Sequence, residues 1–206
     1  MPEVCLGAPF IIGKYRSAVK HLILHGTEGD ETGGTGFFCS DFPGSIATAR
    51  HLVSDGANLL RIENEDGTLL SNGPFEVRLA GADLDLALVN CNMPAGVTPL
   101  RIEWEQRALS ELDRVLVVGY PPIAHHAPAV VFTEGQIASF AKKQTGDRYS
   151  TIISKMTEPG YSGGPVLSST GLVVAVIEQE NVFHRKDGGQ SIFVGATPGH
   201  YFSAFR

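Results

Sequence analysis

Short apolar runs of strand length recur along the whole chain, and they constrain its fold more than any other feature. Examples are "AVKHLILH", "RVLVVGYP" and "GLVVAVIEQ". Val, Ile, Phe and Thr, which favour extended backbone, dominate these runs, and Gly, Pro, Asp and Asn separate them. The 24 glycines and 12 prolines supply many tight turns. The pattern predicts a mostly β protein of about a dozen strands.

Helix-like composition is rare in this sequence. "EWEQRALSELD", residues 103–113, is the one stretch whose composition predicts a helix. The C-terminal stretch "GHYFSAFR", residues 199–206, allows a second, short helix. No repeat typical of a solenoid occurs. We therefore expect helix only at the margins of a β architecture.

A stretch rich in turn residues divides the predicted strands into two groups. "NMPAGVTPL", residues 92–100, carries two prolines and one glycine near the middle of the chain. About six predicted strands lie on each side, which fits two packed six-stranded antiparallel β-barrels with a cleft between them. We expect an N-terminal barrel over residues 1–93, a linker over 94–100 and a C-terminal barrel over 101–206.

Charge and cysteine content narrow the class of protein. The chain of 206 residues has a net charge of −6 and no Lys/Arg run, so nucleic acid is not the expected partner. Cys5, Cys39 and Cys91 form no CxxC motif, and we expect Cys39 and Cys91 to be buried rather than part of a disulfide framework. The sequence shows no signal peptide and no run as long as a membrane span. These features favour a cytoplasmic protein without membrane contact.

One serine stands in an unusual setting. "EPGYSGGPVL", residues 158–167, surrounds Ser162 with small residues and ends in an apolar run. Taken alone, such a serine more often belongs to a structural turn than to an active site. A serine hydroxyl becomes a nucleophile when a base and an orienting acid accompany it. His51 in "IATARHLV" and Asp85 in "ADLDLALV" offer these groups, in the order His, Asp, Ser.

These blocks resemble the trypsin/chymotrypsin-like serine peptidases, and most closely the compact bacterial branch that includes the HtrA-type proteases. "TARHLV" is similar to the TAxH block of the family, "DLAL" to its D-[IL]-A-L block and "GYSGGPV" to its G-x-S-G-G-P block. "GTGFF", "VVGYP", "TEGQIASF" and "FVGATP" add weaker matches in the same order. The resemblance covers residues 18 to 200 and implies a chymotrypsin-like pair of barrels with the active site between them.

The resemblance implies a role for each residue of the three blocks. Ser162 is the expected nucleophile, His51 the expected general base and Asp85 the acid that orients His51. The backbone N–H groups of Gly160 and Ser162 are the expected oxyanion hole. Asp83 competes with Asp85, because "DLDL" offers two aspartates, but the family aspartate directly precedes the [IL]-A-L run. We expect Asp83 to be a solvated charge.

The sequence says less about specificity. The resemblance implies that Met156 lies at the floor of the specificity pocket, where a trypsin-like Lys/Arg preference would need an acidic residue, so we expect an apolar side chain at the cleaved residue. Glu178 and Glu180, which the resemblance places in a wall of the pocket, either favour basic substrate side chains or face water. Tyr161 replaces the aspartate of the animal digestive members, so activation by an N-terminal ion pair is not expected. The resemblance assigns these residues to substrate binding: Met156, Thr157, Glu178, Gln179 and Glu180.

The resulting expectation is a serine endopeptidase that acts on polypeptides through an acyl-enzyme intermediate. It needs no cofactor, and the remaining histidines show no spacing typical of metal ligands. The alternative is a gated or inactive fold of the same kind that serves as a protein-binding module. An activating protein partner and further domains of a longer chain are left open by the sequence.

Overall fold

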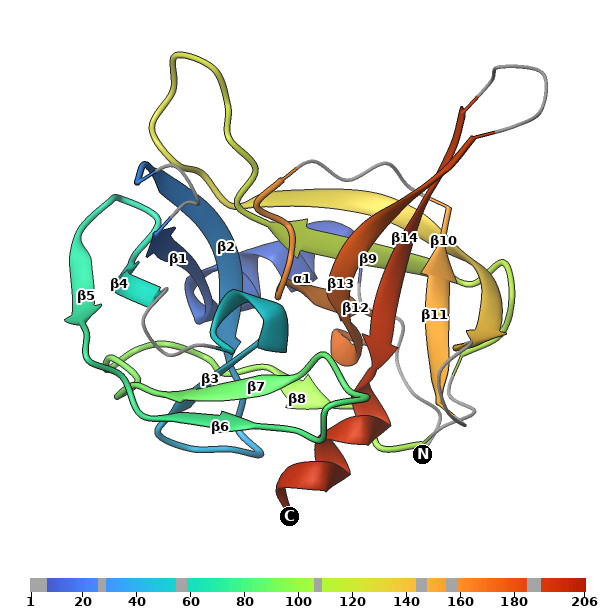
Figure 1. Cartoon of the computed structure of the whole chain (residues 1–206), viewed down its shortest axis with the longest axis horizontal. Coiled ribbons are helices and arrows are strands. Elements are labelled where there is room, and N and C mark those ends of the chain that lie inside the picture. The colour runs from blue at the N-terminus through green and yellow to red at the C-terminus, as the bar shows by residue number, and fades with distance from the viewer. Residues whose placement is uncertain are drawn as a thin grey trace.

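Two sheets of seven strands each hold the named strands of the chain (Figure 1). The computed structural model describes residues 7–25, 29–54, 59–105, 109–143, 148–154, 159–184 and 190–206, and the side chains of these residues except 179–192. The expected all-β fold is confirmed. In the described part of the chain, no helix is both long and apolar enough to cross a lipid bilayer.

The first sheet contains the strands of the N-terminal half. Their order is β5-β4-β1-β2-β3-β7-β6, and every neighbouring pair is antiparallel. The sheet curls into a half-barrel, and its end strands do not pair with each other in the described residues. The strands are β1 (Val19–His25), β2 (Glu31–Phe38), β3 (Ser45–Thr48), β4 (Leu59–Glu63), β5 (Leu69–Asn72), β6 (Val77–Leu79) and β7 (Ala87–Asn90).

The second sheet closes on itself. Its order is β12-β9-β10-β11-β14-β13-β8, and β12 also pairs with β13, so six strands form a barrel. The short strand β8 runs parallel to β13 at the edge. The strands are β8 (Arg101–Ile102), β9 (Arg114–Gly119), β10 (Val131–Lys142), β11 (Tyr149–Ile153), β12 (Pro165–Leu167), β13 (Leu172–His184) and β14 (Gln190–Pro198).

Strand β9 shows how the two sheets pack. Its side chains alternate between two faces, as in any strand. Val115 and Val117 belong to the core of the closed barrel, whereas Leu116 and Val118 belong to the core shared with the first sheet. All four are buried, which explains why "RVLVVG" is apolar without alternation. Burial of each such side chain stabilises the fold by about 1.5–3 kcal/mol.

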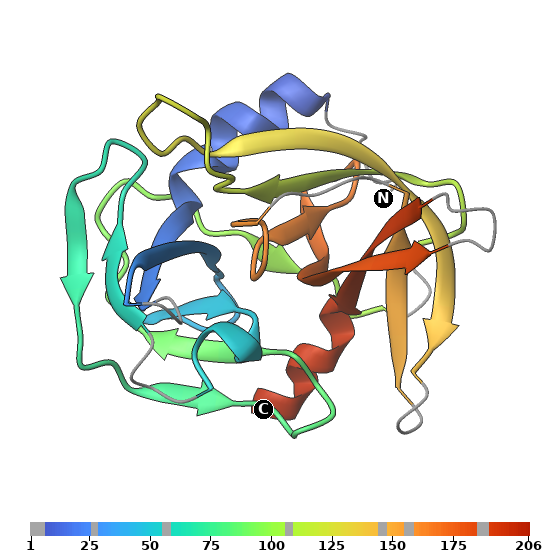
Figure 2. The same ribbon diagram turned by 45° about the horizontal axis from the view of Figure 1, so that its top comes forward.

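The two ends of the chain cross between the sheets (Figure 2). The N-terminal helix α1 (Ala8–Tyr15) continues into η1 (Arg16–Ala18) and lies beside β9, with Ile11 buried. The C-terminal 3-10 helix η3 (Gly199–Phe205) packs Phe202 and Phe205 against Phe42, next to β3. Each end thereby ties its own sheet to the other.

The predicted helix over residues 103–113 is wrong for the described part of that stretch. Residues 103–105 and 109–113 are not helical, and residues 106–108 lie outside the described residues. The backbone N–H of Leu112, which a helix would bond within itself, donates to Ile137 on β10, and the N–H of Glu103 donates to Val173 on β13, so both ends of the stretch are bound to strands. Leu112 also has φ +72°, which a helix does not allow. Helix α1 was missed, although proline in its first turn is a typical start signal.

Candidate active site

His51 and Asp85 lie at one end of the first sheet and form a hydrogen-bonded pair. His51 is in the 3-10 helix η2 (Arg50–Leu52) just after β3, and Asp85 is two residues before β7, the neighbour of β3. The ring Nδ1 of His51 lies 2.7 Å from Oδ2 of Asp85, and the backbone N–H of His51 donates to Oδ1 at 2.8 Å. One carboxylate oxygen thus binds the ring and the other binds the backbone of the same residue, which leaves Nε2 to face another partner.

The environment of Asp85 keeps its side chain ionised. Burial alone would raise the pKa of this carboxyl group. Hydrogen bonds from the ring and backbone of His51 outweigh burial, so the pKa lies below the ordinary value of 3.8. Asp85 therefore carries a negative charge at neutral pH beside His51.

Asp83 has a different partner. Its Oδ2 accepts a hydrogen bond from Nε of Arg148 at 2.9 Å, and 44% of its side chain is exposed. This exposed ion pair links the segment before β7 to the residue that precedes β11. Among the described contacts of the two aspartates, those with His51 belong to Asp85.

The loop that carries Ser162 is anchored to the first sheet. The backbone N–H of Thr35 on β2 donates to the carbonyl of Ser162 at 2.9 Å. The hydroxyl of Thr35 donates to the carbonyl of Gly160 at 2.5 Å, and the hydroxyl of Thr48 donates to the carbonyl of Thr35 at 2.7 Å. Thr48 ends β3, three residues before His51. The second barrel therefore presents Ser162 to the strand that leads into His51.

Glycine is required at three positions around Ser162. A Cβ on Gly163 would lie 2.2 Å from the carbonyl oxygen of Thr35, and one on Gly160 would lie 2.2 Å from that of Tyr120. A Cβ on Gly164 would lie 2.0 Å from the carbonyl oxygen of Val118. Gly160 and Gly163 also have φ of +96° and +81°. The glycines of "GYSGGP" allow this loop to approach its neighbours closely.

The hydroxyl of Ser162 lies against the second barrel. Its Oγ donates to the carbonyl of Glu178 on β13 at 3.1 Å. Within the described residues, no hydrogen bond joins this hydroxyl to the ring of His51. The structure thus brings the backbone of Ser162 to the end of β3, while its side chain binds β13.

The predicted oxyanion donors are not used to hold the loop. The described bonds that fix it use as donors the Thr35 hydroxyl and the N–H groups of Thr35, Tyr120, Gly163, Gly164 and Ile177. The carbonyl of Gly160 points toward Thr35 and Tyr120, away from solvent. The anchoring bonds therefore do not involve the N–H groups of Gly160 and Ser162.

Comparison with known proteins identifies the family. The family model described as the trypsin-like peptidase domain matches residues 34–176, more than half of the chain, and this range includes His51, Asp85 and Ser162. The chain belongs to the trypsin-like peptidase family. The family resemblance noted in the sequence blocks is thereby confirmed.

Two known proteins show how far the likeness extends. The uncharacterised protein y4bJ of Sinorhizobium fredii is 30% identical over 145 residues, which cover 70% of this trypsin-like chain but 21% of that protein. A solved structure of the HtrA-type protease AlgW with a tripeptide has a TM-score of 0.67 and 18% identity, over 94% of this chain and 60% of that one. The second comparison supports the fold alone.

The residues expected to form the specificity pocket of this trypsin-like peptidase are described in part. Met156 and Thr157 lie outside the described residues. The carboxylate of Glu178 accepts hydrogen bonds from Lys143, at 2.7 Å, and from Thr197, so this glutamate does not simply face water. Gln179 and Glu180 pair through their backbone with Gly195 and Val194 of β14.

Sequence analysis missed the residues that anchor the Ser162 loop. Thr35 and Thr48 are fully buried, and the N–H of Tyr120 donates to the Thr35 hydroxyl at 3.0 Å. The available signals were the threonines in "GTGFF" and "TARH", but these two blocks supported only the family resemblance and no role was predicted for their threonines. Tyr161, which replaces the family aspartate, is buried in the core of the second barrel. Cys39 and Cys91 are buried, as predicted.

Proposed function

We propose that this chain is a serine endopeptidase that cleaves polypeptides with Ser162, His51 and Asp85. The observation that carries the proposal is the chain of hydrogen bonds between the two sheets. Thr35 on β2 binds the backbone of Ser162, and Thr48, which ends β3 three residues before His51, binds Thr35, so the serine backbone is linked to the His51–Asp85 pair. An oriented base and a serine are the two parts that nucleophilic catalysis needs.

The reaction begins with a movement of the Ser162 hydroxyl. A rotation about χ1 breaks its hydrogen bond to the Glu178 carbonyl and turns Oγ toward Nε2 of His51. Oγ attacks the carbonyl carbon of the peptide as His51 takes the hydroxyl proton. Asp85, ionised and bonded to Nδ1, stabilises the resulting imidazolium.

The tetrahedral intermediate collapses to an acyl-enzyme, which water then hydrolyses. The N–H groups of Gly160 and Ser162, which the anchoring bonds leave out, donate to the oxyanion. The C–N bond breaks as His51 gives its proton to the leaving amine, and the acyl group stays on Ser162. Water then attacks the ester carbon as His51 takes one of its protons. The C–O bond to Ser162 breaks, His51 returns that proton to Oγ, and the carboxylic acid product leaves. These steps use side chains and backbone groups of this chain together with water.

Hydrolysis of denatured casein tests the proposal. The wild-type protein should release peptides, and Ser162→Ala should lower the rate by about 10⁶-fold. Ser40→Ala is a matched control, because it removes a similar hydrogen bond from a serine hydroxyl to a backbone carbonyl, that of Leu100, in the segment between β2 and β3 and outside the expected site residues. Equal rates in wild type and Ser162→Ala would refute the assignment. No hydrolysis by either protein would favour the protein-binding module instead.

A further inference from the structure

A pocket of about 490 Å³ adjoins the Ser162 loop. It lies between β1, β2, β4 and the segment that follows β9, and Pro159 and Gly160 of the Ser162 loop form part of its lining. Pro121, Pro122 and Ile123 give it an apolar wall. None of these residues belongs to the specificity pocket expected from the sequence.

The contacts of the Ser162 loop place this pocket on the side of Ser162 that faces away from β13. The Ser162 hydroxyl binds Glu178 of β13, whereas the Gly160 carbonyl binds Thr35 and Tyr120. If the substrate pairs with β13 before the cleaved bond, its chain continues past Gly160 after that bond. The pocket therefore lies where the segment that follows the cleaved bond leaves the site.

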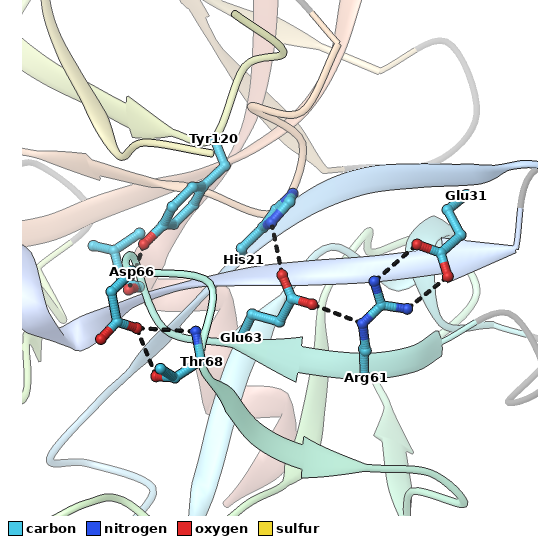
Figure 3. Close-up of polar contacts among 8 residues, drawn as sticks. His21, Glu31, Arg61, Glu63, Asp66, Thr68 and Tyr120 are labelled. Carbon is cyan, nitrogen blue, oxygen red and sulfur yellow. Dashed lines mark hydrogen bonds and ion pairs between the residues drawn. The ribbon is translucent and has the colours of Figure 1, made fainter. Parts of the chain in front are cut away.

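Charged residues line the other end of the pocket, where Glu63 lies between Arg61 and the ring of His21 (Figure 3). The two terminal nitrogens of Arg61 bind both oxygens of Glu31, at 2.6 and 2.8 Å. Nε of Arg61 binds Oε1 of Glu63 at 2.6 Å. Oε2 of Glu63 lies 3.7 Å from Nδ1 of His21, too far for a hydrogen bond.

His21 provides a second, independent sign that the polar groups at this end of the pocket are not fully hydrogen-bonded. The residue is 8% exposed, and its Nδ1 is buried without a hydrogen-bond partner among the described residues. Its ring stacks on Tyr120 with centroids 5.0 Å apart, so both rings line the pocket. Burial lowers the pKa of His21, Arg61 lowers it further and Glu63 opposes this. With a neutral His21, two carboxylates face one guanidinium, and the group carries a net negative charge.

We propose that this pocket binds a lysine or arginine side chain in the substrate segment that follows the cleaved bond, with Glu63 as the acceptor. The apolar wall suits the aliphatic stem of such a side chain, and the charged end suits its cationic head. Glu63 is 13% exposed on its side chain, so a cation there meets little competition from water. This inference rests on the proposed function.

Binding to the Ser162→Ala protein tests the pocket without hydrolysis. The probes are the tripeptide amide Ala-Arg-Ala and the same peptide with citrulline, a neutral isostere of arginine. Their free amino terminus imitates the amine released by cleavage. The ring resonances of His21 in NMR titrations report binding. The arginine peptide should bind about fivefold more tightly than the citrulline peptide, as expected for a partly exposed ion pair.

Three variants in the Ser162→Ala background make the test specific to Glu63. Glu63→Gln should abolish the preference for arginine, and Arg61→Gln should increase it, because the competing guanidinium is gone. Glu65→Gln is the matched control, since Glu65 pairs with Arg16 outside this pocket. Equal binding of the two peptides, or a preference that survives Glu63→Gln, would overturn the inference. Casein hydrolysis that depends on Ser162 would leave the proposed function intact in that case.

Discussion

Two histidine–carboxylate pairs in the first sheet have similar chemistry and different geometry. His51 and Asp85 are 2.7 Å apart, and 43% of the His51 side chain is exposed. His21 and Glu63 are 3.7 Å apart, and 10% of the His21 side chain is exposed. Both carboxylate oxygens of Asp85 bind His51, whereas Glu63 gives one oxygen to Arg61.

The comparison shows that residue type alone does not assign a role. The short contact orients the His51 ring and leaves its second nitrogen accessible, which suits a general base. In the longer contact, Nδ1 of His21 and Oε2 of Glu63 are too far apart to form a hydrogen bond. Oε2 of Glu63 can therefore accept a hydrogen bond from a cationic group of a ligand. Each of the following experiments acts on one pair and not on the other.

The largest expected effect concerns the acid of the first pair. Asp85→Asn should lower the rate of casein hydrolysis by about 10⁴-fold, because an amide cannot hold the required His51 tautomer or offset its positive charge. Asp83→Asn is the matched control from the same "DLDL" stretch. It breaks an exposed ion pair with Arg148, so the rate should change by less than about threefold. The opposite pattern in initial rates would transfer the orienting role to Asp83.

A smaller effect is expected from the second pair, in the pH dependence of stability. The pKa of His21 in the folded protein lies below the ordinary value of 6.5, chiefly through burial. As pH falls below 6.5, the unfolded chain binds a proton that the folded protein resists, so the free energy of unfolding decreases. The decrease is at most about 1.4 kcal/mol per pH unit, until the pH reaches the folded pKa.

His21→Phe isolates this contribution, because it keeps the stacking on Tyr120 and removes the titrating ring. Urea unfolding at pH 7.5, 6.5 and 5.5 should show a shallower loss of stability than in wild type. The exposed His125 supplies the control, and His125→Asn should follow the wild-type curve. The lowered pKa of Asp85 acts in a separate range, since its stabilisation is lost only as pH falls below 3.8. Identical slopes in His21→Phe and wild type would show that His21 is not held neutral by burial.

The sequence predicted the β class and the pairing of His51 with Asp85 because both depend on local patterns. Apolar runs mark β9 and β13, "TARH" begins at the last residue of β3, and "DLAL" ends in the first residues of its neighbour β7. Strands β5 and β8 were not among the predicted runs, because "LLSN" of β5 neither alternates nor stays apolar and the two residues of β8 are too few for a pattern. The helix expected at 103–113 failed because composition does not reveal that Val173 and Ile137 accept hydrogen bonds from this stretch.

Contacts between distant segments explain what sequence patterns could not predict in the site. Thr35 reaches residues 160 and 162 across the two sheets, and nothing in "GTGFF" names those partners. The pocket beside Gly160 depends on β1, β4 and the segment after β9 meeting in space. His21 and Glu63 lie in ordinary strand sequences, and their role follows from burial and distance.

Reaction with a fluorophosphonate probe tests the central claim most directly. Such probes label a serine that is activated by an adjacent base and an oxyanion hole. We predict that intact-mass analysis shows one adduct on the wild-type protein and none on Ser162→Ala. An adduct that persists in Ser162→Ala, or a wild-type protein that stays unlabelled, would contradict an assembled catalytic site built from His51, Asp85 and Ser162.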